Sequence, residues 1–337
     1  MPIAPPTTTM DTMRERFTTP QPRRAATSRL NDIREHMKRD IGLALFPALA
    51  HDVDIYAAIW ALLRETMLAG PGTRVDKEIV AAAVSVANRC AYCVAAHTTF
   101  LHAAGQHDIA DDLWNDQPPR DPSHAALINW GGNTRRPTPN PAPFDDDHAP
   151  GIIGTAVTFH FVNRMISALM DDDLLPAGLQ RSRTVRRLTG TALGSITRRT
   201  HEPGTSIRHL GPARAPHAPS WTGNGPIHEA YRALAAATRA DDLLSPTARH
   251  LIHRAVTDLA GQHPPPGAPT DRTLAELPAD ERPGAEIALL AATAGNRITQ
   301  DHIAQWRHGH DDADLVRLVA GGVMISVAPI ATTLDFA

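Results

Sequence analysis

The two cysteines of the chain stand three residues apart, at Cys90 and Cys93, and His97 follows four residues after the second. On a helix these side chains project within about 60° of one another, so the imidazole can exchange a proton with the Cys93 sulfur. Glu78 belongs to the preceding predicted helix, and in a helical hairpin its carboxylate reaches the same pocket. Burial near neutral groups would raise the pKa of Glu78 and let it accept a proton. We predict that this cluster is the chemical centre of the protein.

The local sequence around the cysteines favours the thiolate form of their side chains. Asn88 is a good N-cap residue, so a helix is expected from about residue 90 to residue 104, with Gly105 as its C-cap. Both cysteines then occupy the first turns, where the helix dipole stabilises a negative charge. Arg89 adds a positive charge beside them, and each effect lowers the pKa of a thiol.

Metal binding is the first alternative for a Cys-x-x-Cys pair. Cys90, Cys93 and His97 would supply three zinc ligands, with His102 or His107 as a fourth. On a continuous helix each additional histidine projects roughly 100° or more from Cys90, so neither converges on the pair, and a three-ligand catalytic site stays open. Two buried core thiols are the second alternative, although cysteine is scarce here and pairs only at this point. A thioredoxin fold is disfavoured because no strand precedes the motif.

The bulk composition favours a globular helical protein. The chain has 337 residues, 42% of them hydrophobic and only 4% aromatic, and alanine is abundant, as in packed helices. The formal charge of −3 offers no basic surface for nucleic acid. The N-terminus lacks the apolar run of a signal peptide, and the uncharged stretch 318–334 is shorter than the roughly 20 residues of a membrane span. We expect a cytoplasmic protein outside the membrane, with 318–334 as a buried helix.

The spacing of apolar residues predicts an all-α fold. Residues at helical spacing run from Leu30 to Gly70, where Pro71-Gly72 ends the pattern, and no stretch alternates as a strand would. The other expected helices cover 75–87, 90–104, 155–170 and, with an interruption at 264–267, the region from 227 to the C-terminus. Residues 1–27 are expected to be disordered, and 117–150 and 202–226 to be largely loop, because these stretches are rich in proline and polar residues.

An internal repeat suggests two related helical halves. The pairs Glu78-Ile79 and Asn88-Arg89 recur 208 residues later as Glu286-Ile287 and Asn296-Arg297, with alanine-rich sequence and no gap between them. The second copy lacks the thiols, since Ile298 and Asp301 stand in their places. A chance match of two alanine-rich helices is the alternative. The predicted domains are a disordered segment 1–27, a redox half 28–115, a loop-rich connector with one apolar helix region at 116–226, and a degenerate second half 227–337.

The run from Glu78 to His97 resembles the alkylhydroperoxidase D and carboxymuconolactone decarboxylase superfamily. Its redox-active branch places a Glu twelve residues before a Cys-x-x-Cys motif and a His four residues after the second Cys, and all four positions match here. Weaker similarity extends on both sides, from Phe46-Pro47 to Gly105. The resemblance implies an all-helical, AhpD-like bundle that is usually oligomeric, and thiol peroxidase chemistry.

By this resemblance, Cys93 attacks the peroxide oxygen and becomes a sulfenic acid, with which Cys90 condenses to form a disulfide. His97 and Glu78 belong to the proton relay that generates the thiolate. An external dithiol or partner protein, such as a dihydrolipoyl-type donor, then reduces the disulfide, and no cofactor or metal is implied. Tyr92 stands where well-known members have a His, and because Tyr does not titrate near neutral pH the relay is expected to be weaker or differently tuned. The decarboxylase branch lacks the dithiol, which argues against lactone decarboxylation.

Three functions are consistent with the sequence. The first is a peroxidase that reduces small organic hydroperoxides through the Cys90/Cys93 dithiol. The second is a dithiol adaptor that passes electrons to a peroxiredoxin, and it differs from the first in that peroxide alone does not oxidise its thiols. The third is a helical scaffold or redox sensor, whose thiols would titrate near the free value of about 8.5. The expected partners are a small hydroperoxide, a thiol reductant and further copies of the chain.

Other polar groups have simpler interpretations. His160 belongs to an apolar helix, where a hydrogen-bonded core histidine is favoured over a residue of the peroxide pocket. Arg64 and Glu65 are expected to be surface or interface charges. The arginine-rich run 181–187 is expected to pair with the acidic run 171–173, either in solvent or between subunits.

Overall fold

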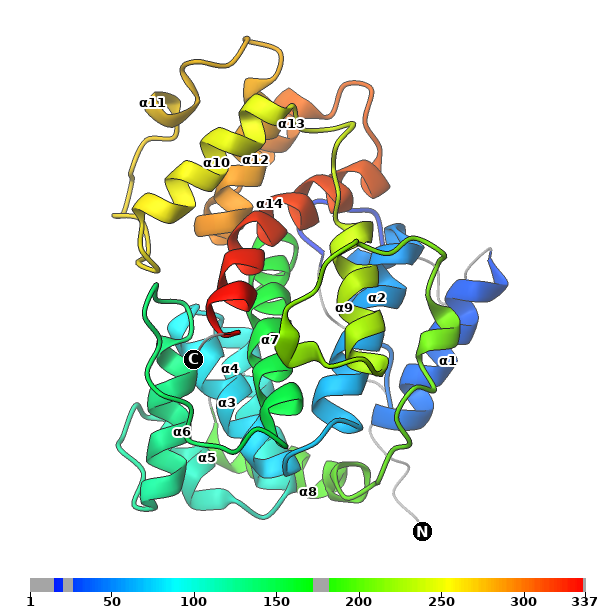
Figure 1. Ribbon diagram of the computed structural model, residues 1–337, viewed down its shortest axis with the longest axis vertical. Helices are drawn as coiled ribbons and strands as arrows, with labels where there is room; N and C mark the ends of the chain where they lie inside the picture. Colours follow the sequence, from blue (N-terminus) through cyan, green and yellow to red (C-terminus); the bar gives the residue numbers. More distant parts are fainter. Residues whose placement is uncertain (1–14, 21–26, 172–181, 336–337) are drawn as a thin grey trace.

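The computed structural model describes residues 15–20, 27–171 and 182–335 of the chain, and these residues form an all-α protein (Figure 1). Within those three ranges the only strand-like pairing is an isolated antiparallel bridge between Glu15 and Met170. The predicted all-α class is confirmed.

The helices of the first part of the chain surround the cysteines. In order they are α1 (Ser28–Ile41), the 3-10 helix η1 (Pro47–His51), α2 (Val53–Leu63), the π-helical turn η2 (Arg64–Leu68), α3 (Arg74–Ala87), α4 (Ala91–Ala103), α5 (His107–Trp114), α6 (Pro122–Asn133) and α7 (Ala149–Leu169). The predicted helices 75–87 and 90–104 correspond to α3 and α4 within one residue at each end. Gly105 follows α4 with a φ of 80°, as a residue that ends a helix requires.

The remaining helices lie after the segment that follows α7. They are α8 (Arg183–Thr197), the short turns η4 (Ile207–His209) and η5 (Ser220–Thr222), α9 (Pro226–Ala237), α10 (Pro246–Asp258), α11 (Asp271–Leu274), α12 (Arg282–Thr293), η6 (Gly295–Arg297), α13 (Gln300–Trp306) and α14 (Asp312–Thr333). The predicted loop 202–226 holds only the two short turns before α9 begins.

Helix α7 is the centre of the molecule (Figure 1). It packs against α3 of the site and against α12 and α14 of the C-terminal part, so both parts share one apolar core. A helix that is covered on every side must be apolar all round, which is why its sequence lacks a polar face. The predicted helix at 155–170 is thus confirmed, although it begins six residues earlier than expected, at Ala149.

The prediction that 117–150 is largely loop is wrong for α6. Asp121 caps this helix by accepting the amide of Ser123 at 2.8 Å, and Pro122 takes the first helical position, where a proline is well tolerated. The helix packs against α3, and its Trp130 is 1% exposed, with its ring against the edge of Phe144. An Asp-Pro pair ahead of an apolar stretch is therefore the sequence signal that was available for this helix.

Part of the predicted disordered segment 1–27 is ordered. Arg16 donates to the carbonyl oxygens of Ser167 at 3.0 Å and Ile298 at 2.6 Å, so residues 15–20 are held against the end of α7 and the turn before α13. The prediction of disorder does not hold for these residues. Residues 1–14 and 21–26 lie outside the described residues.

In the part of the chain that the structure describes, two helices are long and apolar enough to cross a membrane, α7 and α14. In each, most of the apolar window is buried inside the protein, 89% for α7 and 67% for α14. The stretch 318–334, predicted as a buried helix, forms most of α14. Burial of this kind is typical of the core helices of a folded domain.

The C-terminal part contains a second helical hairpin in the register of the sequence repeat. Helix α3 begins at Arg74, and α12 begins at the corresponding Arg282. A turn and the short helix α13 follow α12, as a turn and α4 follow α3. The division of the chain into two related halves stays a prediction, because equal helix boundaries can also arise in unrelated hairpins.

Candidate active site

The turn between α3 and α4 holds the cysteines. Arg89 adopts a left-handed backbone conformation with a φ of 58°, and the amide of Cys90 donates to the Ser85 carbonyl oxygen at 3.0 Å. Cys90 is itself the N-cap of α4, because its sulfur accepts the backbone amide of Cys93 at 3.3 Å. The predicted N-cap, Asn88, is instead the C-cap of α3. The predicted N-cap thus lies two residues before the observed one. The cysteines still occupy the first turn of α4, where the helix dipole favours a thiolate.

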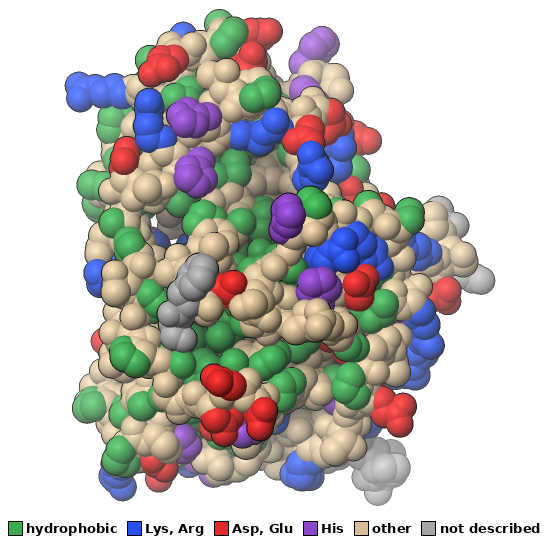
Figure 2. Space-filling view, viewed as in Figure 1, with side chains coloured by type: hydrophobic (Ala, Val, Ile, Leu, Met, Phe, Trp, Pro, Cys, Tyr) green, Lys and Arg blue, Asp and Glu red, His purple; other side chains and the backbone are tan. Residues whose placement is uncertain are grey.

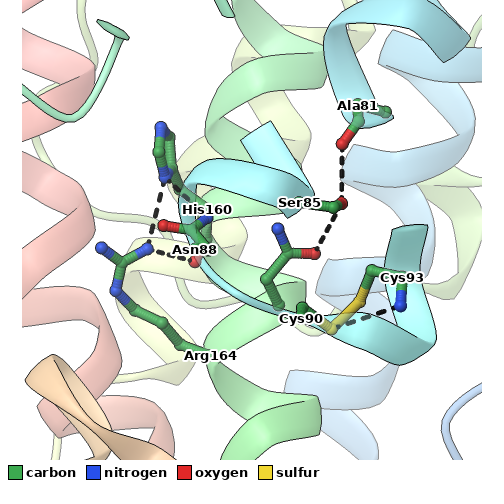
Figure 3. Close-up of a disulfide and its surroundings, with 8 residues drawn as sticks. Ala81, Ser85, Asn88, Cys90, Cys93, His160 and Arg164 are labelled. Atoms are coloured by element: carbon green, nitrogen blue, oxygen red, sulfur yellow. Dashed lines mark hydrogen bonds between the residues drawn. A yellow bond between two sulfur atoms is a disulfide. The ribbon is translucent and has the colours of Figure 1, made fainter. Parts of the chain in front are cut away.

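The two sulfurs form a disulfide, with the Cα atoms of Cys90 and Cys93 5.3 Å apart (Figure 3). Each cysteine is only 2% exposed. Figure 3 also shows Ser85, whose hydroxyl donates to the Ala81 carbonyl oxygen at 2.6 Å. The Cys-x-x-Cys motif is therefore in its oxidised, disulfide form in this structure.

The structure brings Glu78 and His97 together as predicted. The Nδ1 atom of His97 lies 2.7 Å from Oε2 of Glu78, and both residues are buried, at 4% and 1% exposure. The other carboxylate oxygen of Glu78 accepts from Arg74, with Nη2 at 2.6 Å and Nε at 2.8 Å. Sequence reasoning missed Arg74, although it stands one helical turn before Glu78, a spacing at which charged side chains meet.

Arg74 reverses the expected titration of Glu78. Burial alone raises the pKa of this carboxyl, but the charge of Arg74 and the hydrogen bond from His97 outweigh it and hold the pKa below its ordinary value. The prediction of a raised pKa is therefore wrong, because Glu78 lies between charged groups rather than neutral ones. Glu78 stays ionised at neutral pH and fixes a proton on Nδ1 of His97, which leaves Nε2 as the ring atom free for proton exchange.

A cavity of about 70 Å³ adjoins this group. Cys93, His97, Glu78 and Arg74 contribute to its wall, whereas Cys90 does not. The rest of the wall is apolar and comes from α1, the segment around Phe46, α2, η2, α4 and α7. A small molecule in this cavity would meet both Cys93 and His97.

Comparisons with known proteins identify the family of the chain. Residues 54–109, from α2 to α5, match the model of the carboxymuconolactone decarboxylase family. Over 323 residues the chain is 36% identical to a protein of Mycobacterium tuberculosis (strain ATCC 25618 / H37Rv) named alkyl hydroperoxide reductase, and the alignment covers 94% of this chain and 93% of that one. The chain belongs to the alkylhydroperoxidase D and carboxymuconolactone decarboxylase superfamily.

One solved structure, described as an alkylhydroperoxidase AhpD core from Ralstonia eutropha JMP134, aligns with 23% identity and a TM-score of 0.39. The alignment covers 52% of this chain and 98% of the chain in that structure. The family resemblance drawn from the Glu78–His97 spacing is confirmed by the full-length relative.

Tyr92 is the residue at which this chain departs from the expected motif, which has a His there. It is 6% exposed and lines the same cavity as Cys93. Burial raises the pKa of Tyr92, so its hydroxyl stays protonated at neutral pH. The ring of Phe159, which also lines the cavity, meets the ring of His97 edge to face at a centroid distance of 4.3 Å, which restricts the orientation of the imidazole.

His160 does not belong to the cavity. It is fully buried in α7, where Nε2 lies 2.8 Å from the Thr134 hydroxyl. Its Nδ1 lies 3.0 Å from the side-chain nitrogen of Asn88 (Figure 3). The favoured interpretation, a hydrogen-bonded core histidine, is confirmed. Its contact with Asn88 ties α7 to the turn that carries the disulfide.

Two further expectations about charged residues need correction. Arg64 and Glu65, expected at a surface or interface, are 3% and 1% exposed and bind each other at 2.9 Å, and Arg64 also binds Asp40 at 2.6 Å. A π-helical turn places both side chains inward, which helical periodicity does not predict. Of the arginine-rich run 181–187, Arg183 and Arg187 pair with Asp111, a residue that the sequence analysis did not consider. Residues 172–181 lie outside the described residues.

The histidines weighed as a fourth zinc ligand face another part of the chain. His102 and His107 meet each other, with their Nδ1 atoms 3.1 Å apart, and His102 also faces Asp111. Within the described residues no group of three or more His, Cys, Asp or Glu side chains is arranged to hold a metal ion.

Lys77 gives a testable pH dependence of stability. It precedes Glu78 on α3, is 2% exposed, and its Nζ donates to the Gly70 carbonyl oxygen at 2.7 Å. Burial lowers the pKa of Lys77 from 10.5 to about 8. Between these two values the unfolded chain binds more protons than the folded one, so the stability of the folded protein rises with pH across this window. The expected rise is about 3 kcal/mol.

We therefore expect Lys77→Met to lose this rise. The measurement is the free energy of unfolding in urea at several pH values from about 8 to 10.5, with wild type compared with the variant. Lys38→Met is the matched control, because the Lys38 side chain is 49% exposed and should keep the wild-type slope. Equal pH slopes in wild type and Lys77→Met would contradict the prediction.

Proposed function

We propose that the chain is a thiol-dependent peroxidase that reduces small organic hydroperoxides through the Cys90/Cys93 dithiol. The observation that carries this proposal is that Cys93 and the Glu78–His97 pair line one small apolar cavity. The name of the M. tuberculosis relative, alkyl hydroperoxide reductase, supports the same chemistry.

The first step is attack of the Cys93 thiolate on a peroxide oxygen. The O–O bond breaks, Cys93 becomes a sulfenic acid, and the leaving alkoxide takes a proton and departs as the alcohol. His97 supplies that proton, having taken it from the Cys93 thiol when the thiolate formed. The step is balanced: the sulfur is oxidised by two electrons and the peroxide is reduced by two.

The second step closes the disulfide. The Cys90 sulfur attacks the sulfenic sulfur of Cys93, an S–S bond forms, and water leaves with the Cys90 proton. Glu78 acts as a positioning residue in both steps, because it holds the imidazole through Nδ1 while Arg74 keeps the carboxylate ionised. The apolar wall of the cavity keeps water away from the sulfenic acid and favours an alkyl group over a charged substituent.

The cycle ends with reduction by an external dithiol, a small molecule or a partner protein. Since only Cys93 lines the cavity, we propose that the reductant attacks the Cys93 sulfur and releases Cys90 as a thiolate. Release of Cys90 is favoured because its sulfur, at the N-cap of α4, already accepts a hydrogen bond from the backbone amide of Cys93. An N-cap thiolate is a stable leaving group.

The test uses the full chain, reduced and freed of reductant, and one equivalent of tert-butyl hydroperoxide. We expect loss of both free thiols, a mass change equal to two hydrogens, and one equivalent of tert-butanol. Thiols that stay free with excess peroxide would overturn the peroxidase proposal. If those thiols are then oxidised only by a peroxiredoxin disulfide, the protein is a dithiol adaptor instead.

A further inference from the structure

A second cavity, of about 340 Å³, borders the turn that leads into Cys90. Its wall combines Asn88 and Arg89 of that turn with Arg164 of α7, the stretch 263–267 after α10, and the residues around Arg297 in η6. It thus lies where the α3–α4 hairpin meets the corresponding turn of the C-terminal part.

The cavity wall carries positive charge and no carboxylate. Its charged residues are Arg89, Arg135, Arg164 and Arg297, joined by His263. Among the described residues, no Asp or Glu oxygen lies within 4.0 Å of a nitrogen of these four arginines.

Several arginines outside this cavity bind a carboxylate. Arg64, Arg74 and Arg317, for example, each bind a carboxylate at 2.6 to 2.7 Å. Since the chain has 36 acidic residues against 33 basic ones, carboxylates are not scarce. Within the described residues, the four arginines of this cavity thus lack a carboxylate partner although carboxylates are abundant in the chain.

Neutral acceptors hold the two most buried of these arginines in place. Arg135 donates to the Ala87 carbonyl oxygen at 2.6 Å and lies 2.6 Å from the His263 ring, while its Nε is buried without a partner. Arg164 donates to the carbonyl oxygens of His160 at 2.8 Å and Ala292 at 3.2 Å. Both guanidinium groups are thus fixed before any ligand arrives, which reduces the entropy that binding costs.

The arginines also act on one another electrostatically. Burial lowers the pKa of Arg135 to about 10, with a further contribution from the charges of Arg89 and Arg136. Burial likewise lowers the pKa of Arg164 to about 9, with a contribution from Arg135. Several positive charges confined together in this way raise the free energy of the empty site, and an anion among them would lower it.

A neighbouring hollow extends the same surface. It has a volume of about 230 Å³ and shares Arg135 and Arg164 with the first cavity, and Arg136 also lines it. Figure 2 shows the molecule hollowed in this region, where α10 and α14 face the segment after α6. A ligand could therefore reach Arg135 and Arg164 from solvent through this hollow.

We propose that the 340 Å³ cavity binds a small organic phosphate. Guanidinium groups match the oxygens of a phosphate in a planar, two-bonded geometry, and four of them favour a group with more than one negative charge. The volume falls within the range of small-molecule sites and exceeds that of a phosphate ion. Pro264, Pro265 and Ala294 supply an uncharged wall for the remainder of the ligand.

The test is isothermal titration of the full-length oxidised protein with pyrophosphate at constant ionic strength, alongside a citrate titration. We expect one pyrophosphate per chain and a rise in the melting temperature. The double variant Arg89→Gln/Arg297→Gln should bind at least about tenfold more weakly. Arg89 is exposed and Arg297 is half-buried, so the variant is chosen to preserve the fold, which circular dichroism checks.

The matched control is Arg239→Gln/Arg254→Gln, which removes the same charge from exposed side chains. This control should bind pyrophosphate as wild type does. Equal loss in both double variants would reduce the effect to net charge and overturn the site. Absence of heat and of a melting shift at millimolar pyrophosphate would also overturn it, and tighter binding of citrate would overturn the phosphate assignment.

Discussion

Replacing Cys93 by serine is expected to reduce peroxide-dependent turnover by roughly a thousandfold or more, the order observed when a catalytic nucleophile is removed. The reason is chemical, because a serine hydroxyl does not ionise near neutral pH and cannot form a sulfenic acid. Cys93 is also the cysteine that lines the cavity shared with His97. The measurement is steady-state reduction of a small alkyl hydroperoxide with an external dithiol as electron donor.

Cys90→Ser is the matched variant, since it removes the other thiol from the same turn. With no reductant present, it should still reduce one peroxide per chain and then stop with Cys93 as a sulfenic acid, which dimedone traps as a covalent adduct detectable by mass spectrometry. If Cys93→Ser instead gave the single turnover and the adduct, the two roles would be reversed. If both variants turned over as wild type does, the dithiol would have no part in the reaction.

The central part of the site could be predicted because it is local. Glu78, Cys90, Cys93 and His97 lie on two consecutive helices, and a tight turn between helices forces them into a hairpin. Helical periodicity then decides which side chains share a face. The carboxylate and imidazole consequently meet at 2.7 Å, as the spacing predicts.

The parts that sequence reasoning missed depend on contacts between distant segments. The core position of Arg64 requires Asp40 of α1 and the inward π-helical turn, neither of which periodicity shows. The arginines of the second cavity come from the α3–α4 turn, the end of α6, α7 and η6, so no single stretch signals them. Arg74 is different: its helical-turn spacing from Glu78 was visible, and the error was to treat the surroundings of the carboxylate as neutral.

Glu78→Gln should lower kcat of the peroxidase by about 10² to 10⁴-fold while Cys93 stays in place. Gln has nearly the shape of Glu, but its amide nitrogen can donate to Nδ1 of His97 and move the ring proton to Nε2. The imidazole then cannot accept the Cys93 proton through Nε2. A positioning role of this kind predicts a changed pH profile of kcat/KM, which a merely structural role would not produce.

The same substitution should destabilise the fold by about 3 kcal/mol at neutral pH, the order for breaking a buried ion pair, because Arg74 loses its partner. The pKa of Glu78 is lowered in the folded state, so its carboxylate stabilises the protein above the unfolded pKa near 4.5. That contribution disappears as pH falls through the lower folded value. The stability difference between wild type and variant should therefore close in acid.

Glu286→Gln is the control that the sequence repeat provides. Glu286 occupies the position of Glu78 in the second hairpin, but its partners are the Thr270 hydroxyl and a more distant His302. Rates expressed per folded chain separate lost catalysis from lost folding. A Glu78→Gln protein with the kcat and pH profile of wild type would exclude the carboxylate from the relay. A loss of kcat in Glu78→Gln but not in Glu286→Gln would assign the orientation of His97 to the buried Arg74–Glu78 pair.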